Sequence, residues 1–147
     1  MKISEFLSPT ETLLNIRASD KEQLLQDLAR KASAKLKLPE GAIISELFKR
    51  EGLGSTGMGN GVAIPHARFP EIEKPFGIVA RLKQPIDFDA IDGKPVDIVF
   101  VLLLPTASEG EQLGALACVA RKLRTADDLV LLRRAKNATE LYAALTD

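Results

Sequence analysis

Gly54-Ser-Thr-Gly-Met-Gly-Asn-Gly-Val-Ala-Ile-Pro-His-Ala-Arg68 is the stretch on which the fold and chemistry of this chain depend. It contains His66, the single histidine of the sequence. Glycine tolerates positive φ and lets backbone N–H groups approach a ligand, so the stretch predicts an anion-cradling loop. The glycines of that loop are Gly54, Gly57, Gly59 and Gly61. Pro65 favours an extended Ile64, which predicts a short strand over residues 62–64 that presents His66 at its end.

Composition predicts one cytoplasmic domain over residues 1–147, because a chain of this length can bury a single core. Twenty basic residues balance twenty acidic ones and the pI is about 6.6, so nucleic acid is not an expected partner. The single cysteine, Cys118, cannot form an internal disulfide, and the first residues lack the apolar core of a signal peptide. The longest apolar run, residues 98–104, is too short for membrane insertion.

Hydrophobic periodicity predicts alternating helices and strands. Strands are expected at 12–16, 77–82 and 95–104, and the last of these is apolar enough to be a central strand covered on both faces. Helices are expected at 19–38, where Ser19 and Glu22 match a capping box, at 39–51, and at 111–123 after a loop over 106–110. Thr125 and Asn137 are expected to cap two short final helices. This order predicts an α/β sandwich with one mixed sheet.

The surroundings of His66 predict a phosphohistidine site. A neutral imidazole can attack phosphorus with one nitrogen while a hydrogen bond fixes the tautomer through the other. Phosphoryl transfer also needs positive charge and donors around the equatorial oxygens, for which we select Arg50, Ser55 and Thr56. Arg68 is a second, weaker candidate. A charge-balanced protein must dock its partner through a local apolar surface, for which we select Met58, Ile64 and Phe69.

Simpler interpretations stay open for some of these residues. Arg50 lies in the last turn of a predicted helix, where it would also complement the helix dipole, and the glycines would also suit a tight connection. The glycine pattern fails the dinucleotide fingerprint because position 62 is valine, and no Gly-Lys-Ser/Thr follows to form a nucleotide P-loop. One histidine and one cysteine without paired spacing predict no metal site and no cofactor.

The motif ending in Pro65-His66, with Arg50-Glu51 upstream and Ile91-Asp-Gly-Lys-Pro-Val-Asp-Ile-Val-Phe100 downstream, resembles the type-2 enzyme IIA domains of the bacterial phosphotransferase system. The nitrogen-regulatory branch is the most similar. The resemblance implies a three-layer α/β/α sandwich in which His66 accepts a phosphoryl group on Nε2. The implied donor is an HPr-like carrier, itself phosphorylated by an enzyme I that consumes phosphoenolpyruvate. The implied role of Arg50 is to hold the phosphoryl group.

The chain departs from this family at Gln112, where family members usually have a second histidine. Glutamine can donate a hydrogen bond to phosphate but cannot carry positive charge. The nitrogen branch implies a regulatory role, linked to nitrogen or potassium and exerted on downstream target proteins. Two alternatives stay open: a binding module that acts in its unphosphorylated form, and a fructose- or mannitol-specific IIA component.

Overall fold

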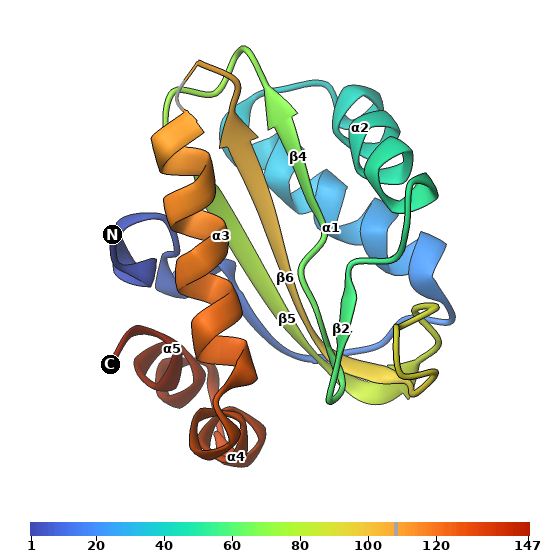
Figure 1. Ribbon diagram of the computed structural model, residues 1–147, viewed down its shortest axis with the longest axis vertical. Coiled ribbons are helices and arrows are strands. Elements are labelled where there is room, and N and C mark those ends of the chain that lie inside the picture. The colour runs from blue at the N-terminus through green and yellow to red at the C-terminus, as the bar shows by residue number, and fades with distance from the viewer. Residues whose placement is uncertain (108) are drawn as a thin grey trace.

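The computed structural model describes residues 1–107 and 109–147 (Figure 1). Within these residues the helices are α1 (Lys21–Leu36), α2 (Glu40–Gly52), α3 (Glu109–Arg124), α4 (Ala126–Arg134) and α5 (Ala138–Thr146), preceded by the short 3₁₀ turns η1 (Ile3–Glu5) and η2 (Pro9–Glu11). The strands are β1 (Thr12–Ile16), β2 (Gly57–Gly59), β3 (Val62–Ala63), β4 (His66–Phe69), β5 (Phe76–Ile86) and β6 (Val96–Pro105).

These strands form one six-stranded sheet around β6. On one side β6 pairs antiparallel with β5, which pairs parallel with β1. On its other side β6 pairs parallel with β3 and then with β4, and β2 pairs antiparallel with β3 alone. The expected mixed sheet is therefore confirmed, and so is the central position of the apolar strand, whose residues are buried except for Asp97.

Two clusters of buried side chains lie on opposite faces of this sheet because side chains alternate along each strand. One cluster joins Val99, Val101 and Leu103 of β6 to the apolar faces of α1 and α2. The other joins Ile98, Phe100, Leu102 and Leu104 to η1, α3, α4 and α5. Figure 1 shows α3 in front of the sheet and α1 behind it. Helices therefore cover both faces.

The helix ends differ in detail from the sequence expectations. Asp20, not Ser19, caps α1: its carboxylate accepts from the N–H of Gln23 at 2.8 Å, whereas Ser19 contacts the Gln23 side chain. Asn137 caps α5 as expected. Thr125 occupies the cap position of α4, but its hydroxyl donates to the Arg121 carbonyl instead. Helix α3 already begins at Glu109, so the expected loop over 106–110 is shorter, and its residue 108 lies outside the described residues.

The glycine-rich stretch forms a β-hairpin, which corrects the expected open anion-cradling loop. Asn60 and Gly61 turn the chain between β2 and β3 with φ of 57° and 79°. Both central residues of a type I′ turn need positive φ, and Asn-Gly is the favoured pair at this turn. The Asp92 carboxylate accepts from the N–H of Asn60 at 3.1 Å, and Arg133 of α4 donates to the Asn60 carbonyl at 2.5 Å. The turn is thus held from two sides.

Pro65 interrupts the strand that was expected to end at His66. Strand β3 stops at Ala63 and β4 begins with His66, both of them paired with β6. Proline cannot donate to the ladder, but its carbonyl still accepts from the N–H of Leu102 at 2.9 Å. The strand therefore resumes after one break, and His66 lies at the beginning of a strand instead of at the end of one.

Gly77 of β5 provides a test of core packing. A Cβ atom added there would lie 2.7 Å from the Phe100 ring and 3.2 Å from the Phe6 carbonyl oxygen. We expect Gly77→Ala to lower the free energy of unfolding by about 1–3 kcal/mol, the usual effect of overpacking, when measured by urea denaturation. The control is Gly41→Ala on α2, where nothing lies within 4 Å and alanine favours the helix. Equal stabilities for the two variants would contradict this account.

Candidate functional site

His66 lies where two layers of the molecule meet. It is the first residue of β4 and pairs with Leu102, whose side chain belongs to the cluster under α3. Within the described residues β4 pairs with β6 alone, because the hairpin strand β2 pairs only with β3, so β4 is an edge strand. Arg50 reaches His66 from the last turns of α2, on the other face of the sheet. The open edge lets side chains from both faces converge.

One backbone hydrogen bond fixes the tautomer of His66. Its Nδ1 lies 2.8 Å from the carbonyl oxygen of Ile64. A carbonyl oxygen only accepts, so Nδ1 bears the proton and Nε2 keeps its lone pair. The Gly61 and Pro65 carbonyls bond to N–H groups of β6, whereas the backbone of Ile64 faces the hairpin side, so its carbonyl is left to the imidazole. The nitrogen expected to react is thus the unprotonated one.

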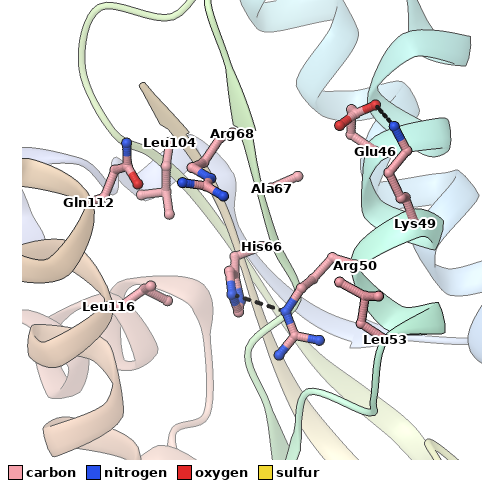
Figure 2. A pocket seen from close by; sticks show the side chains of 10 residues that line it. All are labelled: Glu46, Lys49, Arg50, Leu53, His66, Ala67, Arg68, Leu104, Gln112 and Leu116. Atoms are coloured by element: carbon pink, nitrogen blue, oxygen red, sulfur yellow. Dashed lines mark hydrogen bonds and ion pairs between the residues drawn. The ribbon is translucent and has the colours of Figure 1, made fainter. Parts of the chain in front are cut away.

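Arg50 faces that lone pair. Its Nε lies 3.4 Å from Nε2 of His66 (Figure 2). Its Nη1 donates to the Gly54 carbonyl at 2.7 Å. Within the described residues these are its only protein acceptors, so most of its five N–H groups stay available to an anion. The guanidinium is therefore held beside Nε2 by the first glycine of the motif.

The surroundings of His66 favour its neutral form. Partial burial away from water is the main cause that lowers the pKa of His66 below 6.5, and the positive charges of Arg50 and Arg68 lower it further. The Ile64 carbonyl and the Glu51 carboxylate act in the opposite direction without overcoming these effects. A neutral imidazole at pH 7 is the form that can act as a nucleophile.

An open cavity of about 320 Å³ lies in front of His66 (Figure 2). Its wall is mostly cationic and apolar; the residues are Glu46, Lys49, Arg50, Leu53, His66, Ala67, Arg68, Leu104, Gln112 and Leu116. Lys49 is paired with Glu46 at 3.2 Å. A second cavity of about 340 Å³ on the hairpin side shares Arg50, His66 and Leu116 with the first. Small anions and a partner surface can therefore both reach the imidazole.

The hydroxyl groups expected to bind phosphate are used inside the protein. Ser55 Oγ donates to the Phe88 carbonyl at 2.6 Å and accepts from the N–H of Gly57. The Thr56 hydroxyl donates to the Glu51 carboxylate, which also accepts from the N–H of Thr56. Each hydroxyl has one proton to donate. In this geometry Ser55 and Thr56 hold the loop in place and leave phosphate to other donors.

Glu51 is a site residue that the search for phosphate ligands did not select. Its carboxylate is almost fully buried and pairs with Lys21 Nζ of α1 at 2.8 Å. The Lys21 ammonium also lies 4.6 Å from the centre of the Phe88 ring. This cluster ties α1, the end of α2 and the loop before β2 together. The adjacent Arg50-Glu51 pair was the sequence clue, but only the fold brings Lys21 to it.

Gln112 lies in the cavity wall but is already bonded. It is buried on α3, and its Nε2 donates to the Pro105 carbonyl at 2.5 Å. Since the side chain closes the end of β6 against the start of α3, its donor is directed at the backbone and away from His66. Gln112 therefore helps to shape the cavity wall, and this role is larger than its role in phosphate binding.

The three expected docking residues are not equivalent. Met58 is partly exposed and lines the second cavity. Ile64 also lines this cavity, but it is 5% exposed and packs into the cluster under α3, so its selection is corrected to a mainly structural position. Phe69 is 4% exposed and packs into the cluster under α1 and α2, so it has no surface to offer a partner and its selection is corrected. The physical reason is strand alternation: Phe69 and His66 are three residues apart and face opposite sides of β4.

Two other apolar side chains replace Phe69 at the site. Leu53, which lines the first cavity, is 83% exposed, and Ile91, which lines the second, is 85% exposed. These are the most exposed large apolar residues of the described chain. Sequence reasoning missed both because an apolar residue in a loop carries no sign of its exposure.

In residues 1–107 and 109–147 no three His, Cys, Asp or Glu side chains gather as a metal cluster would require. None of the helices described has both the length and the apolarity needed to cross a bilayer.

Comparison with known proteins gives consistent matches over the whole chain. The model of the family described as "Phosphoenolpyruvate-dependent sugar phosphotransferase system, EIIA 2" matches residues 5–147. The nitrogen regulatory protein of Bradyrhizobium diazoefficiens is 43% identical over 145 residues, which are 99% of this chain and 95% of the relative. That of Escherichia coli is 35% identical over 148 residues, 100% of this chain and 91% of the relative.

A solved structure shows the same fold. The crystal structure of the nitrogen regulatory protein IIA-Ntr from Neisseria meningitidis superposes with a TM-score of 0.93 at 35% identity, covering 98% of this chain and 99% of that one.

The environment of His66 predicts its titration, which is easy to follow because the chain has one histidine. By NMR we expect His66 to titrate below pH 6.5, and we expect Arg50→Met to raise its pKa toward the ordinary value by removing a positive charge. A pKa in the parent at or above 6.5 would contradict the burial argument.

The same shift makes stability depend on pH. Because the folded-state pKa is the lower one, the contribution of His66 is complete above pH 6.5 and is lost as pH falls through the folded-state pKa. The parent should therefore lose more stability than His66→Gln between pH 7 and pH 5 in urea denaturation.

Proposed function

Because the chain belongs to the EIIA 2 family of the phosphoenolpyruvate-dependent sugar phosphotransferase system, we propose that His66 is the phosphoryl acceptor of a phosphocarrier. The proposed donor is an HPr-like carrier with a phosphorylated histidine, supplied from phosphoenolpyruvate by an enzyme I. In the transfer a bond forms between His66 Nε2 and phosphorus as the donor's N–P bond breaks. The electron pair of that bond stays on the donor nitrogen. Because the carrier supplies the phosphoryl group, the proposed transfer uses no nucleotide on this chain, and Arg50 supplies the positive charge.

The observation that most supports this function is the oriented imidazole. The 2.8 Å contact with the Ile64 carbonyl keeps the proton on Nδ1, and Nε2 faces an open cavity. The lowered pKa of His66 keeps that nitrogen unprotonated at neutral pH. A nucleophile with a fixed tautomer next to a guanidinium is the arrangement that a loose phosphoryl-transfer transition state needs.

Arg50 is the proposed phosphate ligand. Charge-assisted hydrogen bonds from a guanidinium to phosphate contribute about 1.5–3 kcal/mol each and are directional. Its anchor on the Gly54 carbonyl positions it without using its remaining donors. The alternative role of complementing the α2 dipole is compatible with this, since Arg50 lies in the last turn of that helix.

A regulatory role is favoured over sugar transport. The relatives that match this chain over almost their whole length are described as nitrogen regulatory proteins, which supports downstream target proteins as its partners. We propose that it acts as a single cytoplasmic domain. The two core clusters support a three-layer α/β/α scaffold. A potassium link, regulation by the unphosphorylated form, and transfer to a fructose or mannitol permease are alternatives for its output.

The first test is phosphoryl acceptance. Phosphoenolpyruvate, enzyme I and an HPr-like carrier should add one phosphoryl group to the protein as an acid-labile, base-stable adduct, detected by intact mass. His66→Ala should accept none, and a labelled His66→Ala would refute the assignment. Adding a permease fragment and its sugar to the labelled protein separates relay from regulation, because only a relay component loses its label.

The second test concerns docking through Leu53 and Ile91. We expect Leu53→Ser/Ile91→Ser to slow carrier-dependent phosphorylation about tenfold, since exposed apolar contacts at the centre of an interface typically contribute more than 1 kcal/mol. Leu131→Ser, on the exposed face of α4, is the matched control and should stay within twofold of the parent. Urea midpoints should match in all three proteins, and equal rates would place the interface elsewhere.

A further inference from the structure

Arg68 is a cation without a protein partner at the edge of the His66 cavity. Its side chain is exposed, and within residues 1–107 and 109–147 it forms no hydrogen bond or ion pair. It lines both the cavity in front of His66 and a neighbouring cavity of about 510 Å³ between the start of α2 and the end of β4. An unneutralised guanidinium in this position is available to an anion.

Strand geometry directs Arg68 to the same side as His66. The two residues are two positions apart on β4, so their side chains project from the same face, about 7 Å apart along the strand. Their partners on β6, Leu102 and Leu104, both belong to the cluster under α3. Figure 2 shows the Arg68 side chain with His66 on the α3 side of β4. Its charge also contributes to the lowered pKa of His66.

The other polar side chains of the cavity are less available. Lys49 is paired with Glu46, and the amide nitrogen of Gln112 donates to the Pro105 carbonyl. Arg50 approaches His66 from α2, so Arg68 is the cation of the cavity wall that lies on the α3 side of the ring. A phosphoryl group on Nε2 has negatively charged oxygens on all sides, and a single guanidinium cannot contact all of them.

We propose that Arg68 is a second phosphate-binding residue, which holds the phosphoryl group of phosphorylated His66 from the β4 side while Arg50 holds it from α2. This inference rests on the proposed function. It places the second positive charge of the site on β4, the strand that carries His66. On the α3 side of the cavity the polar side chain is Gln112, whose amide is uncharged.

The test uses phosphoramidate, a small donor that needs no carrier protein. His66 Nε2 attacks its phosphorus, the N–P bond of phosphoramidate breaks, and its protonated nitrogen leaves as ammonia. Any effect of a variant on this reaction therefore comes from the phosphoryl site and not from docking. Rates are followed by intact mass at low ionic strength, where screening is weak.

We expect Arg68→Met to lower the rate constant with phosphoramidate about five- to tenfold, and Arg50→Met to lower it at least about tenfold, or ~1.4 kcal/mol. Arg68→Lys, which keeps the charge, should retain at least about half of the parent rate. The control is Arg134→Met, which removes an exposed arginine of α4 that lines neither of the cavities beside His66. Urea midpoints should match the parent for Arg68→Met, because the side chain has no packing or hydrogen-bonding role.

Three results would overturn the inference. The first is an Arg68→Met rate within twofold of the parent, as for the control. The second is an Arg68→Lys rate as low as that of Arg68→Met. The third is slow phosphorylation by the carrier with normal phosphoramidate kinetics, which would make Arg68 a docking residue. A parent protein labelled at His66 by neither donor would instead refute the proposed function.

Discussion

The chemistry of this protein depends on one hydrogen bond, from Nδ1 of His66 to the carbonyl of Ile64. That carbonyl is available because it points away from β6: N–H groups of β6 bond to the Gly61 and Pro65 carbonyls, whereas the N–H of Ile64 donates to Thr56 on the hairpin side. Strand β2 pairs with β3 only as far as Ala63, so no strand on that side uses the Ile64 carbonyl. Pro65 removes one donor to β6 at the break between β3 and β4.

The position of the site at an open sheet edge follows from the short hairpin strand. Strand β2 pairs with β3 and not with β4, so the edge beside His66 stays uncovered within the described residues. Edge strands expose backbone groups and are usually protected, and here α2, Arg50 and the exposed Leu53 lie beside the edge. The same opening that admits an anion gives a partner protein apolar contacts.

A buried ion pair supports this edge from within. Glu51 and Lys21 join α1, α2 and the loop before the hairpin, and the hydroxyl and N–H of Thr56 satisfy the carboxylate. Removing one partner of such a pair leaves an uncompensated buried charge, which usually costs several kcal/mol. The hydroxyl groups of Ser55 and Thr56, which the sequence suggested as phosphate ligands, therefore hold the loop in place. The fixed loop keeps the Gly54 carbonyl where it accepts a hydrogen bond from Arg50.

The sequence by itself determined the elements whose patterns are local. The apolar run of β6, the amphipathic faces of α1 and α2 and the Asn137 cap need only neighbours along the chain, so periodicity and capping chemistry were sufficient to predict them. His66 and Arg50 were selected in the same way, from a motif within 17 residues.

The tertiary structure decided everything that depends on which face a residue presents. Phe69 is buried and Arg68 exposed because β4 alternates between two helical faces, and no single-residue property distinguishes a docking aromatic from a core aromatic. The Asn60-Gly61 pair favours a hairpin turn locally, but the contacts that hold this turn come from Asp92 and Arg133, which lie 32 and 73 residues away in the sequence. Leu53 and Ile91 meet His66 at one surface for the same reason: long-range packing, which local patterns do not encode, sets where the loops lie.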